Sequence, residues 1–269
     1  MTAVDLLFPA RPRRTIASPL ARRIAGRAQL DLGAIRGSGP RGRIVRADVE
    51  RSLAAVPVRV PAAAIPIVPH LHLTADCRID ALLEIRAALN QRCDGHKYAM
   101  TDFLVRAAAR ALADVPEANV VLDGGTARPS ADIDVAVAAA TASGPVALLL
   151  RRADRMGLAQ LSIQRKAMAA RAREGRLEPG ESDGGSLIVW NLGMRGIHSF
   201  AALPDPPRAA MLAVGDGELR PVVRNGVVTI GTVLTCTLSA DPRAIDGRVA
   251  GALLGVIRDL LEDPLLMLV

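Results

Sequence analysis

The sequence of 269 residues is poor in aromatic side chains, which make up only 2% of it. Phenylalanine, tyrosine and tryptophan together supply Phe8, Tyr98, Phe103, Trp190 and Phe200. Proteins that bind single-stranded nucleic acid without sequence preference stack successive bases on several aromatic side chains. These scattered residues are too few for such a platform, so we expect no nucleic-acid partner.

Cysteine and long apolar runs are also scarce. The three cysteines, Cys77, Cys93 and Cys236, are an odd number without metal-ligand spacing, so we expect reduced thiols and no metal site. No apolar run reaches the roughly 18 residues that a membrane-spanning helix needs. The N-terminus lacks the order of segments that defines a signal peptide. These absences predict a cytoplasmic protein without a membrane partner.

Lysine is nearly missing, and the basic residues are distributed unevenly. Only Lys97 and Lys166 are lysines, so the other 32 of the 34 basic residues are arginine. Residues 1–52 contain eleven arginines and four acidic residues, which gives this segment a net charge of +7. From residue 53 onward, 23 basic residues balance 23 acidic ones. The chain therefore has a small basic N-terminal part and a large part without net charge.

Composition divides the chain into a flexible N-terminus, a small domain, a linker rich in Ala, Val and Pro, and a large domain. We place these segments at residues 1–14, 15–53, 54–69 and 70–269. The small domain is expected to contain two short helices around the loop GSGPRGR. Ser18 is a suitable N-cap for the first of them, because Pro19 follows at the first helical position.

The large domain alternates helical and extended patterns. Apolar residues recur at helical spacing in residues 80–92, 101–115, 158–177 and 248–262. Thr101 is expected to cap the second of these helices. Strand-like runs lie between the helices, among them separate strands at residues 209–215 and 219–231, and Asn225-Gly226 signals a hairpin. A mixed α+β domain built on a large sheet is predicted.

Seven stretches of the sequence carry a resemblance to a known family. They are ASPLARRIAGRAQLDLGAIRGSGPRGRIVRADVE in the small domain and PHLHLT, TDFLVRAAARALADVPEAN, GGSLIVWNLGMRGIHSF, PPRAAMLAVG, LRPVV and TLSADPRAIDG in the large one. The small domain resembles the peripheral subunit-binding domain of the dihydrolipoamide acyltransferases of 2-oxo acid dehydrogenase complexes. The large domain resembles their catalytic domain, which has the fold of chloramphenicol acetyltransferase. The resemblance implies an α+β fold with a mixed-sheet catalytic domain behind a two-helix domain.

The resemblance also implies partners. Members of this family form trimers, often built into larger cores through an apolar C-terminal anchor, and the corresponding residues are Leu265, Leu266, Met267 and Leu268. The small domain would bind acidic residues of a dehydrogenase subunit, or a carrier protein. Its candidate arginines are Arg22, Arg23, Arg27, Arg41, Arg43 and Arg46. Guanidinium groups suit this role because they form paired hydrogen bonds with carboxylates. A solvated basic face is the alternative.

The sequence departs from the family in two respects. Relatives carry the acyl group on a lipoyl-lysine in an Asp-Lys-Ala turn, whereas neither Lys97 nor Lys166 lies in such a turn. We therefore expect no lipoyl domain and no covalently bound cofactor, and an acyl donor supplied as a thioester of coenzyme A or a carrier protein. The resemblance places the family's catalytic base, a histidine, at Pro242, and its oxyanion-stabilising Ser or Thr at Trp190. Because a proline ring cannot accept a proton, the usual mechanism is absent.

Four histidines and one retained aspartate remain as candidates for chemistry. His72 and His198 are the candidate replacement bases, and Asp246 matches an aspartate that helps to hold the family's catalytic loop. His70 matches a family position and is expected to be structural, and His96 is expected to be exposed in a polar loop. An ordinary structural role is the alternative for each candidate.

Two functions fit these features. One is a lipoyl-independent acyltransferase that moves an acyl group, such as acetyl, between a coenzyme A or carrier-protein thioester and a hydroxyl or thiol, as stand-alone relatives do in natural-product biosynthesis. The other is a catalytically degenerate core subunit that recruits dehydrogenase-complex partners through its basic domain. Loss of a general base typically costs about 10²–10⁴-fold in rate, which supports the second function. The retained acyl-transfer framework supports the first, which we favour.

Overall fold

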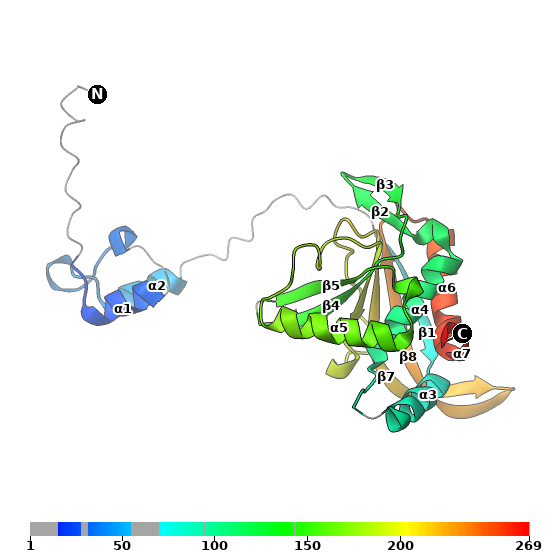
Figure 1. Cartoon of the computed structure of the whole chain (residues 1–269). Helices are drawn as coiled ribbons and strands as arrows, with labels where there is room; N and C mark the ends of the chain where they lie inside the picture. The colour runs from blue at the N-terminus through cyan, green and yellow to red at the C-terminus, as the bar shows by residue number, and fades with distance from the viewer. Residues whose placement is uncertain (1–15, 28–31, 55–69, 94, 143, 269) are drawn as a thin grey trace. The chain divides into compact units, whose positions relative to one another are not determined.

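The structure, a computed structural model, describes residues 16–27, 32–54, 70–93, 95–142 and 144–268 (Figure 1). The chain divides into two compact units, Met1–Ile67 and Val68–Val269. The expected N-terminal segment 1–14 lies outside the described residues, and so does the expected linker 54–69 apart from Ala54.

The small unit contains two α-helices joined through short 3-10 turns. These elements are α1 (Pro19–Arg27), η1 (Leu32–Ala34), η2 (Pro40–Gly42) and α2 (Arg46–Ala54). The predicted N-cap is confirmed, because Ser18 Oγ accepts a hydrogen bond from the backbone N–H of Ala21 at 3.2 Å. The buried core of the unit consists of Ala21, Ala25, Ile44 and Val49. Since this core is so small, the loop between the helices needs polar contacts of its own.

A buried carboxylate supplies those contacts. Asp48 is only 3% exposed, and it accepts hydrogen bonds from the backbone N–H groups of Ser38 at 2.8 Å and Val45 at 3.0 Å. Gly37 fits the same loop because a Cβ there would lie 2.4 Å from the Gly42 carbonyl oxygen. The loop is thereby fixed within the unit, and the arginines that it carries are exposed.

The large unit is built on a six-stranded mixed sheet with the strand order β1-β8-β7-β6-β4-β5. Its strands are β1 (Leu71–Arg78), β4 (Val135–Thr141), β5 (Gly144–Leu150), β6 (Leu187–Asn191), β7 (Ala210–Arg224) and β8 (Val227–Ala240). Its α-helices are α3 (Asp80–Arg92), α4 (Met100–Asp114), α5 (Leu158–Arg173), α6 (Gly247–Glu262) and α7 (Leu265–Leu268). A separate two-stranded sheet, β2 (Val120–Asp123) with β3 (Thr126–Pro129), is not predicted from the sequence. The α+β class and the large sheet are confirmed.

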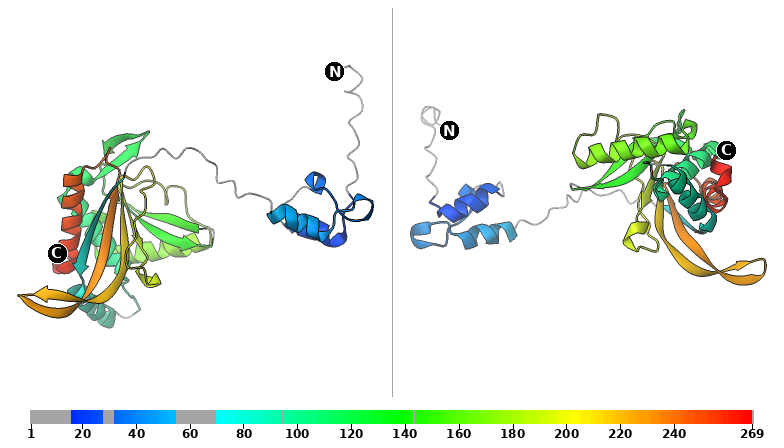
Figure 2. Two further views of the ribbon diagram at one scale, coloured as in Figure 1. Left: turned by 180° about the vertical axis from the view of Figure 1, so that it is seen from behind. Right: turned by 60° about the horizontal axis from the view of Figure 1, so that its bottom comes forward.

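Helices α3 to α6 pack on one face of the large sheet (Figures 1 and 2). Because side chains alternate between the two faces of a strand, Val189, Leu212 and Leu238 point toward the helices and join the main core. The opposite face carries a smaller apolar cluster of Ala136, Leu149, Ile188 and Met211. Among the described residues, no helix is both long and apolar enough to cross a membrane.

Strands β7 and β8 form one long hairpin whose end projects beyond the rest of the unit (Figure 2). The predicted turn is confirmed, because Asn225 and Gly226 have positive φ angles of 50° and 79°. The prediction of two separate strands before this turn is wrong, since residues 210–224 form a single strand. A β-bulge between Val214 and Gly217 maintains the strand where the pattern of the sequence is interrupted.

Helix α4 begins with a different cap from the one predicted. The helix starts at Met100, and the Asp102 carboxylate accepts a hydrogen bond from the backbone N–H of Ala99 at 2.8 Å. The prediction that Thr101 is the cap is wrong, because Thr101 lies inside the first turn. Its hydroxyl instead accepts a hydrogen bond from Asn191 Nδ2 at 3.3 Å.

Asp102 also connects α4 to α5. Its buried carboxylate accepts hydrogen bonds from Ser162 Oγ at 2.7 Å and Arg165 Nε at 2.6 Å. His96 Nε2 lies 3.0 Å from the same Ser162 Oγ, and the His96 ring packs edge-on against Tyr98. The expectation of a solvent-exposed His96 is therefore wrong, because the ring is half-buried in this polar network.

Replacement of Asp102 by alanine tests how much this network stabilises the unit. We expect the free energy of unfolding in urea to fall by about 3–5 kcal/mol, because the mostly buried Arg165 loses its partner. Asp114→Ala in the same helix is the matched control, since its ion pair with Arg110 is exposed and such pairs contribute at most about 1 kcal/mol. Equal losses in the two variants would contradict a stabilising role for the network.

Candidate functional site

A stripe of polar side chains follows the β1–β8 pair on the face of the sheet opposite the helices. Three cross-strand pairs form this polar stripe: His72 with Ser239, Thr74 with Thr237, and Asp76 with Thr235. The closest side-chain polar atoms of these pairs are 2.8, 3.2 and 2.7 Å apart. Residues two apart on a strand share a face, so successive pairs are separated by about 7 Å.

Apolar side chains continue this face beyond the stripe. Trp190 of β6 lies opposite Ala213 of β7, which lies opposite Thr237 of β8, so Trp190 is on the same face as the polar stripe. The indole packs edge-to-face on Phe200, with ring centroids 5.8 Å apart. A bulky side chain held by an aromatic neighbour therefore occupies the position that the resemblance assigns to an oxyanion-stabilising hydroxyl.

The stripe ends at the loop that follows β8. Asp241 and Arg243 form an ion pair there, with Arg243 Nη2 2.6 Å from Asp241 Oδ2, and hydrogen bonding from Arg243 lowers the pKa of Asp241. Asp246 is the N-cap of α6, and its carboxylate accepts a hydrogen bond from the Val249 backbone N–H at 2.8 Å. Pro242 is exposed within this loop. Both retained aspartates thus hold the backbone, while the position that the resemblance assigns to the family's base presents only a pyrrolidine ring.

His72 is the candidate base that lies near this loop. Its Nδ1 is 2.8 Å from the hydroxyl of Ser239, which is fully buried and precedes Pro242 by three positions. A serine hydroxyl can accept as well as donate a hydrogen bond. His72 Nδ1 can therefore carry its hydrogen toward Ser239, which leaves Nε2 of the exposed ring free to accept a proton. His70 stacks loosely on His72 at a centroid distance of 6.4 Å.

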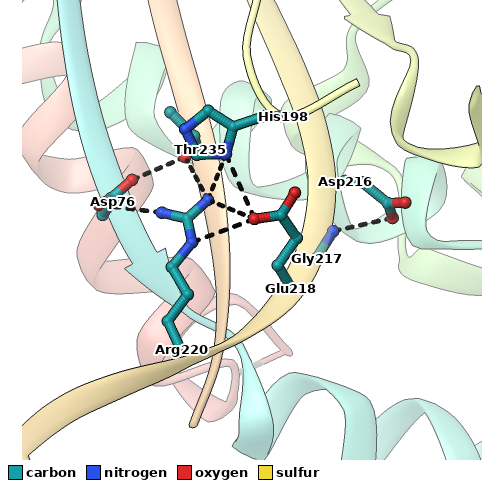
Figure 3. Close-up of polar contacts among 7 residues, drawn as sticks. All are labelled: Asp76, His198, Asp216, Gly217, Glu218, Arg220 and Thr235. Atoms are coloured by element: carbon teal, nitrogen blue, oxygen red, sulfur yellow. Dashed lines mark hydrogen bonds and ion pairs between the residues drawn. The ribbon is translucent and has the colours of Figure 1, made fainter. Parts of the chain in front are cut away.

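His198 lies at the other end of the stripe (Figure 3). Its Nδ1 accepts a hydrogen bond from Arg220 Nη2 at 2.5 Å. Arg220 also forms ion pairs with Asp76 at 3.3 Å and Glu218 at 3.2 Å, and Thr235 Oγ1 donates to Asp76. Arg220 lies in the stretch LRPVV, which carries part of the resemblance without an assigned role, and no motif marks Asp76 or Glu218, so these residues are not predicted as part of a site. Only the pairing of β1, β8 and β7 brings them together.

The two candidate bases belong to separate groups of residues. His72 contacts Ser239, whereas the His198 group surrounds Thr235, which is four positions earlier on β8. This spacing corresponds to about 13 Å along a strand. A single acyl centre therefore cannot use both rings as its base, and of the two it is His72 that pairs with the end of β8 leading into the Pro242 loop.

A cavity of 480 Å³ opens between the sheet and helices α3 and α4, beside the turn that follows Trp190. Its apolar lining includes Ile79, Leu83, Met100 and Leu234. Thr101 and Asn191 add polar groups to this lining. The volume is in the range of about 300–1,000 Å³ that is typical of small-molecule sites. The Asn-Leu-Gly turn is the sequence signal that could have indicated Asn191.

The small unit presents most of the expected partner-binding arginines to solvent. Arg22, Arg23, Arg41, Arg43 and Arg46 are exposed. The side chain of Arg27 lies outside the described part of the unit. Arg46 forms an ion pair with Glu50 at 2.6 Å, and the left-handed backbone of Arg41, with φ of 58°, belongs to the fixed loop.

The expected C-terminal anchor is divided between core and surface. Leu265 and Leu266 are 61% and 54% exposed, whereas Met267 is fully buried in the unit's own core. Arg106 Nε donates to the Met267 carbonyl oxygen at 2.9 Å. The Leu268 side chain lies outside the described residues. Leu265 and Leu266 are therefore the part of the anchor that remains available for a partner.

Cofactor-binding groups can be assessed for the described part of the chain only. There, no set of three or more His, Cys, Asp or Glu side chains is arranged to hold a metal ion. Cys77, Cys93 and Cys236 are free thiols. Both lysine ammonium groups donate to main-chain carbonyl oxygens, Lys97 to Asn90 and Lys166 to Lys97.

Family comparisons agree with this architecture. The model of the 2-oxoacid dehydrogenases acyltransferase catalytic domain matches residues 62–269, and the model of the E3 binding domain matches residues 15–50. The acetyltransferase component of the Zymomonas mobilis pyruvate dehydrogenase complex is 37% identical over 94% of this chain and 66% of that protein. The corresponding Rhizobium meliloti component is 37% identical over 96% of this chain and 69% of that protein. The chain thus spans about two thirds of the length of these relatives.

Solved structures match the large unit. One match is dihydrolipoamide acetyltransferase from Azotobacter vinelandii, solved in a study of the roles of a serine, a histidine and an asparagine in its catalytic mechanism. It is 26% identical to this chain with a TM-score of 0.72, and the match covers 76% of this chain and 85% of that one. The cubic core of a pyruvate dehydrogenase complex is 26% identical with a TM-score of 0.71, and the match covers the same shares of the two chains. Chloramphenicol acetyltransferase shares the fold, at 16% identity and a TM-score of 0.51 over 72% and 88%. The chain therefore belongs to the acyltransferase family of the 2-oxoacid dehydrogenase complexes and combines its catalytic-domain fold with an E3-binding domain.

Proposed function

We propose that this protein transfers an acyl group, with acetyl as the first candidate, from a thioester of coenzyme A or a carrier protein to a hydroxyl or thiol acceptor. The placement of His72 beside the Pro242 loop carries this proposal, because it offers a base where the family's own base is missing. A role in natural-product biosynthesis fits a diffusible donor, and the free cysteines suit the reducing cytoplasm.

The hydrogen bonds of both lysines to main-chain carbonyl oxygens support an acyl donor that is a separate molecule. Lys97 Nζ donates to the Asn90 carbonyl oxygen at 2.5 Å, and Lys166 Nζ donates to the Lys97 carbonyl oxygen. A lipoyl-lysine must instead extend from a mobile turn to reach distant sites. Neither lysine has that setting, so the proposed reaction does not depend on a lipoyl group attached to either of them.

The proposed transfer needs one base. His72 Nε2 takes the proton of the acceptor hydroxyl or thiol while the acceptor oxygen or sulfur attacks the thioester carbonyl carbon. The carbon–sulfur bond of the donor then breaks, and the leaving thiolate takes the proton from the His72 imidazolium. Ser239 fixes the ring through Nδ1 during both steps.

Replacement of His72 by alanine tests this role. With acetyl-coenzyme A as the donor and dihydrolipoamide or a small alcohol as the acceptor, we expect His72→Ala to lower kcat by about 10²–10⁴-fold. Asp114→Ala, at an exposed ion pair on α4 away from the stripe, is the control and should change kcat by no more than a few-fold. With the alcohol, release of the coenzyme A thiol measures the turnover. With dihydrolipoamide, where one thiol is consumed for each one released, chromatography of the S-acetyl product measures it.

Two outcomes would count against His72 as the base. One is full turnover by His72→Ala. The other is that the unmodified protein shows no turnover and Pro242→His does. That substitution restores a base at the position that the resemblance assigns to the family's histidine. The second outcome would favour a different function.

That second function is a degenerate core subunit, and the packing of Trp190 favours it. The indole is held by Phe200 at the position that the resemblance assigns to the oxyanion-stabilising residue, and Pro242 gives the loop after β8 no proton acceptor. In this role the large unit serves as a scaffold, and the small unit binds a dehydrogenase-complex subunit through its exposed arginines.

Charge reversal in the small unit tests partner binding for either function. We expect Arg43→Glu to weaken binding of dihydrolipoamide dehydrogenase by at least about 10-fold in isothermal titration calorimetry, because an interfacial ion pair is replaced by repulsion. Arg36→Glu changes the net charge equally in the same unit and is the control. Equal effects of the two variants would indicate a general charge effect instead of a docking site, and no binding by the unmodified chain would exclude this partner.

Exposed apolar side chains support assembly into a trimer and a larger core. Leu219, Val228 and Ile230 on the projecting hairpin are 76%, 70% and 77% exposed, and Leu265 and Leu266 add a second apolar surface at the C-terminus. Burial of such side chains between copies of the chain removes apolar area from water. We place the trimer contact on the hairpin and the contact between trimers on the C-terminal leucines.

Sedimentation velocity separates these two contacts. Ile230→Glu should convert the assembly to monomers, whereas Leu266→Glu should stop it at the trimer, because each buries a charge at only one contact. Ile163→Glu on α5, another exposed apolar position, should leave the assembly unchanged. A monomeric unmodified chain would show that the hairpin serves another purpose.

A further inference from the structure

His198 is held in place through its backbone as well as through its ring. Gly215, in the bulge of β7, lies so close to the preceding loop that a Cβ there would be 1.9 Å from the His198 carbonyl oxygen. The adjacent Asp216 N–H donates to the Ile197 carbonyl oxygen at 2.7 Å. The bulge therefore fixes the point from which the His198 ring reaches toward the strands.

Arg220 fixes the ring itself (Figure 3). Its side chain is 21% exposed and lies between two carboxylates, with Nη1 3.3 Å from Asp76 Oδ2 and Nη2 3.2 Å from Glu218 Oε2. Nη2 also lies 2.5 Å from His198 Nδ1. Thr235 Oγ1 donates to the second oxygen of Asp76 at 2.7 Å, which holds that carboxylate in position. The guanidinium thus cannot turn away from His198 without losing its acidic partners.

This contact determines which ring nitrogen carries the hydrogen. Arginine has N–H donors and no acceptor, so His198 Nδ1 must offer its lone pair to Arg220. The hydrogen of the neutral ring is then on Nε2. Glu218 Oε2 is the competing partner for an Nδ1–H group, but it is 3.5 Å from Nδ1 and already accepts a hydrogen bond from Arg220.

We propose that Arg220 is a positioning residue that holds His198 as the Nε2–H tautomer, so that His198 donates a hydrogen bond to a bound ligand instead of acting as a base. The His198 side chain is 54% exposed, which leaves room for a ligand on this side of the sheet. The ligand group is an uncharged carbonyl oxygen, because the carboxylates of Asp76 and Glu218 outnumber the Arg220 guanidinium beside the ring and disfavour an anion. The identity of the ligand rests on the proposed acyl transfer, whereas the tautomer does not.

The polar stripe indicates which carbonyl this is. With the thioester at the His72 end of the stripe, the arm that carries the thioester extends toward the Thr235 end, about 13 Å away. A pantetheine arm has two amide groups along its length, and coenzyme A and carrier proteins share this arm. His198 at the far end is placed to bind one of these amide carbonyls.

Nitrogen-15 NMR of the full chain tests the tautomer without any substrate. At pH 8, where an ordinary imidazole is neutral, we expect His198 Nδ1 to give the signal of an unprotonated nitrogen and Nε2 that of an N–H. The chain has only four histidines, so His198→Gln identifies the signals by their loss. Arg220→Met should allow both tautomers to appear. This variant should fold, because Asp76 and Glu218 are 59% and 46% exposed and can be hydrated.

Kinetics test the ligand contact. We expect His198→Ala and Arg220→Met to raise KM for acetyl-coenzyme A by about 2- to 10-fold, the value of one hydrogen bond, with little change in kcat. His198→Gln should restore KM, because its amide can donate but cannot accept a proton at neutral pH. Arg224→Gln, on the same strand and paired with Asp80, is the control. Acetyl-pantetheine should show the same KM changes, and S-ethyl thioacetate, which lacks the amides, should show none.

Several results would overturn the inference. A hydrogen on Nδ1 of His198 at pH 8 would exclude the tautomer. A fall in kcat with unchanged KM, equal in His198→Ala and His198→Gln, would identify His198 as a base. Equal effects on S-ethyl thioacetate would exclude the amide contact, and effects on acetyl-coenzyme A alone would move the contact to the nucleotide. Absence of all turnover would refute the proposed transfer, and the NMR result would still decide the tautomer.

Discussion

Antiparallel pairing of β1 with β8 is the constraint that places the candidate chemistry. Ser239, Thr237 and Thr235 have hydroxyl groups that are almost fully buried, and buried hydroxyls need hydrogen-bond partners. His72, Thr74 and Asp76 supply them across the strands. A shift of one residue would turn these side chains toward the helices and expose the apolar ones. The polar pairs and the apolar core therefore specify the same register, and this register decides which histidine lies at which end of the stripe.

Acidic residues in this chain mainly organise backbone and arginine groups. Asp48 holds the loop of the small unit, Asp102 joins α4 to α5, and Asp246 caps α6. Asp241 accepts hydrogen bonds from Arg243. Each of these carboxylates is occupied by donors that the fold itself provides. Their retention accordingly says more about the stability of the acyltransferase framework than about its activity, and the question of activity moves to the histidines.

Local patterns of the sequence were sufficient for most of the fold. The helix expected at residues 80–92 is Asp80–Arg92, and Asn225-Gly226 forms the hairpin turn because both residues tolerate a positive φ. The cap of α4 was missed because the Asp102 carboxylate competes successfully with Thr101, a choice that depends on contacts with α5. The group around Arg220 could not be predicted, because its members come from three strands and a loop and are adjacent only after the sheet has formed.

Pro242 and Trp190, the residues at the positions that the resemblance assigns to the family's base and oxyanion-stabilising group, differ in how readily they could be replaced. Pro242 is exposed at the end of a strand, so one substitution could place another side chain there without disturbing the core. Trp190 is packed against Phe200, so a small hydroxyl residue at this position would leave the aromatic partner without its contact and open a void in the apolar patch. The effect of replacing Trp190 by a small hydroxyl residue therefore depends on the residue at position 200, since the two side chains share one packing arrangement. A lineage that lost both features would regain the base by a single change, but it would regain the oxyanion site only through coupled changes.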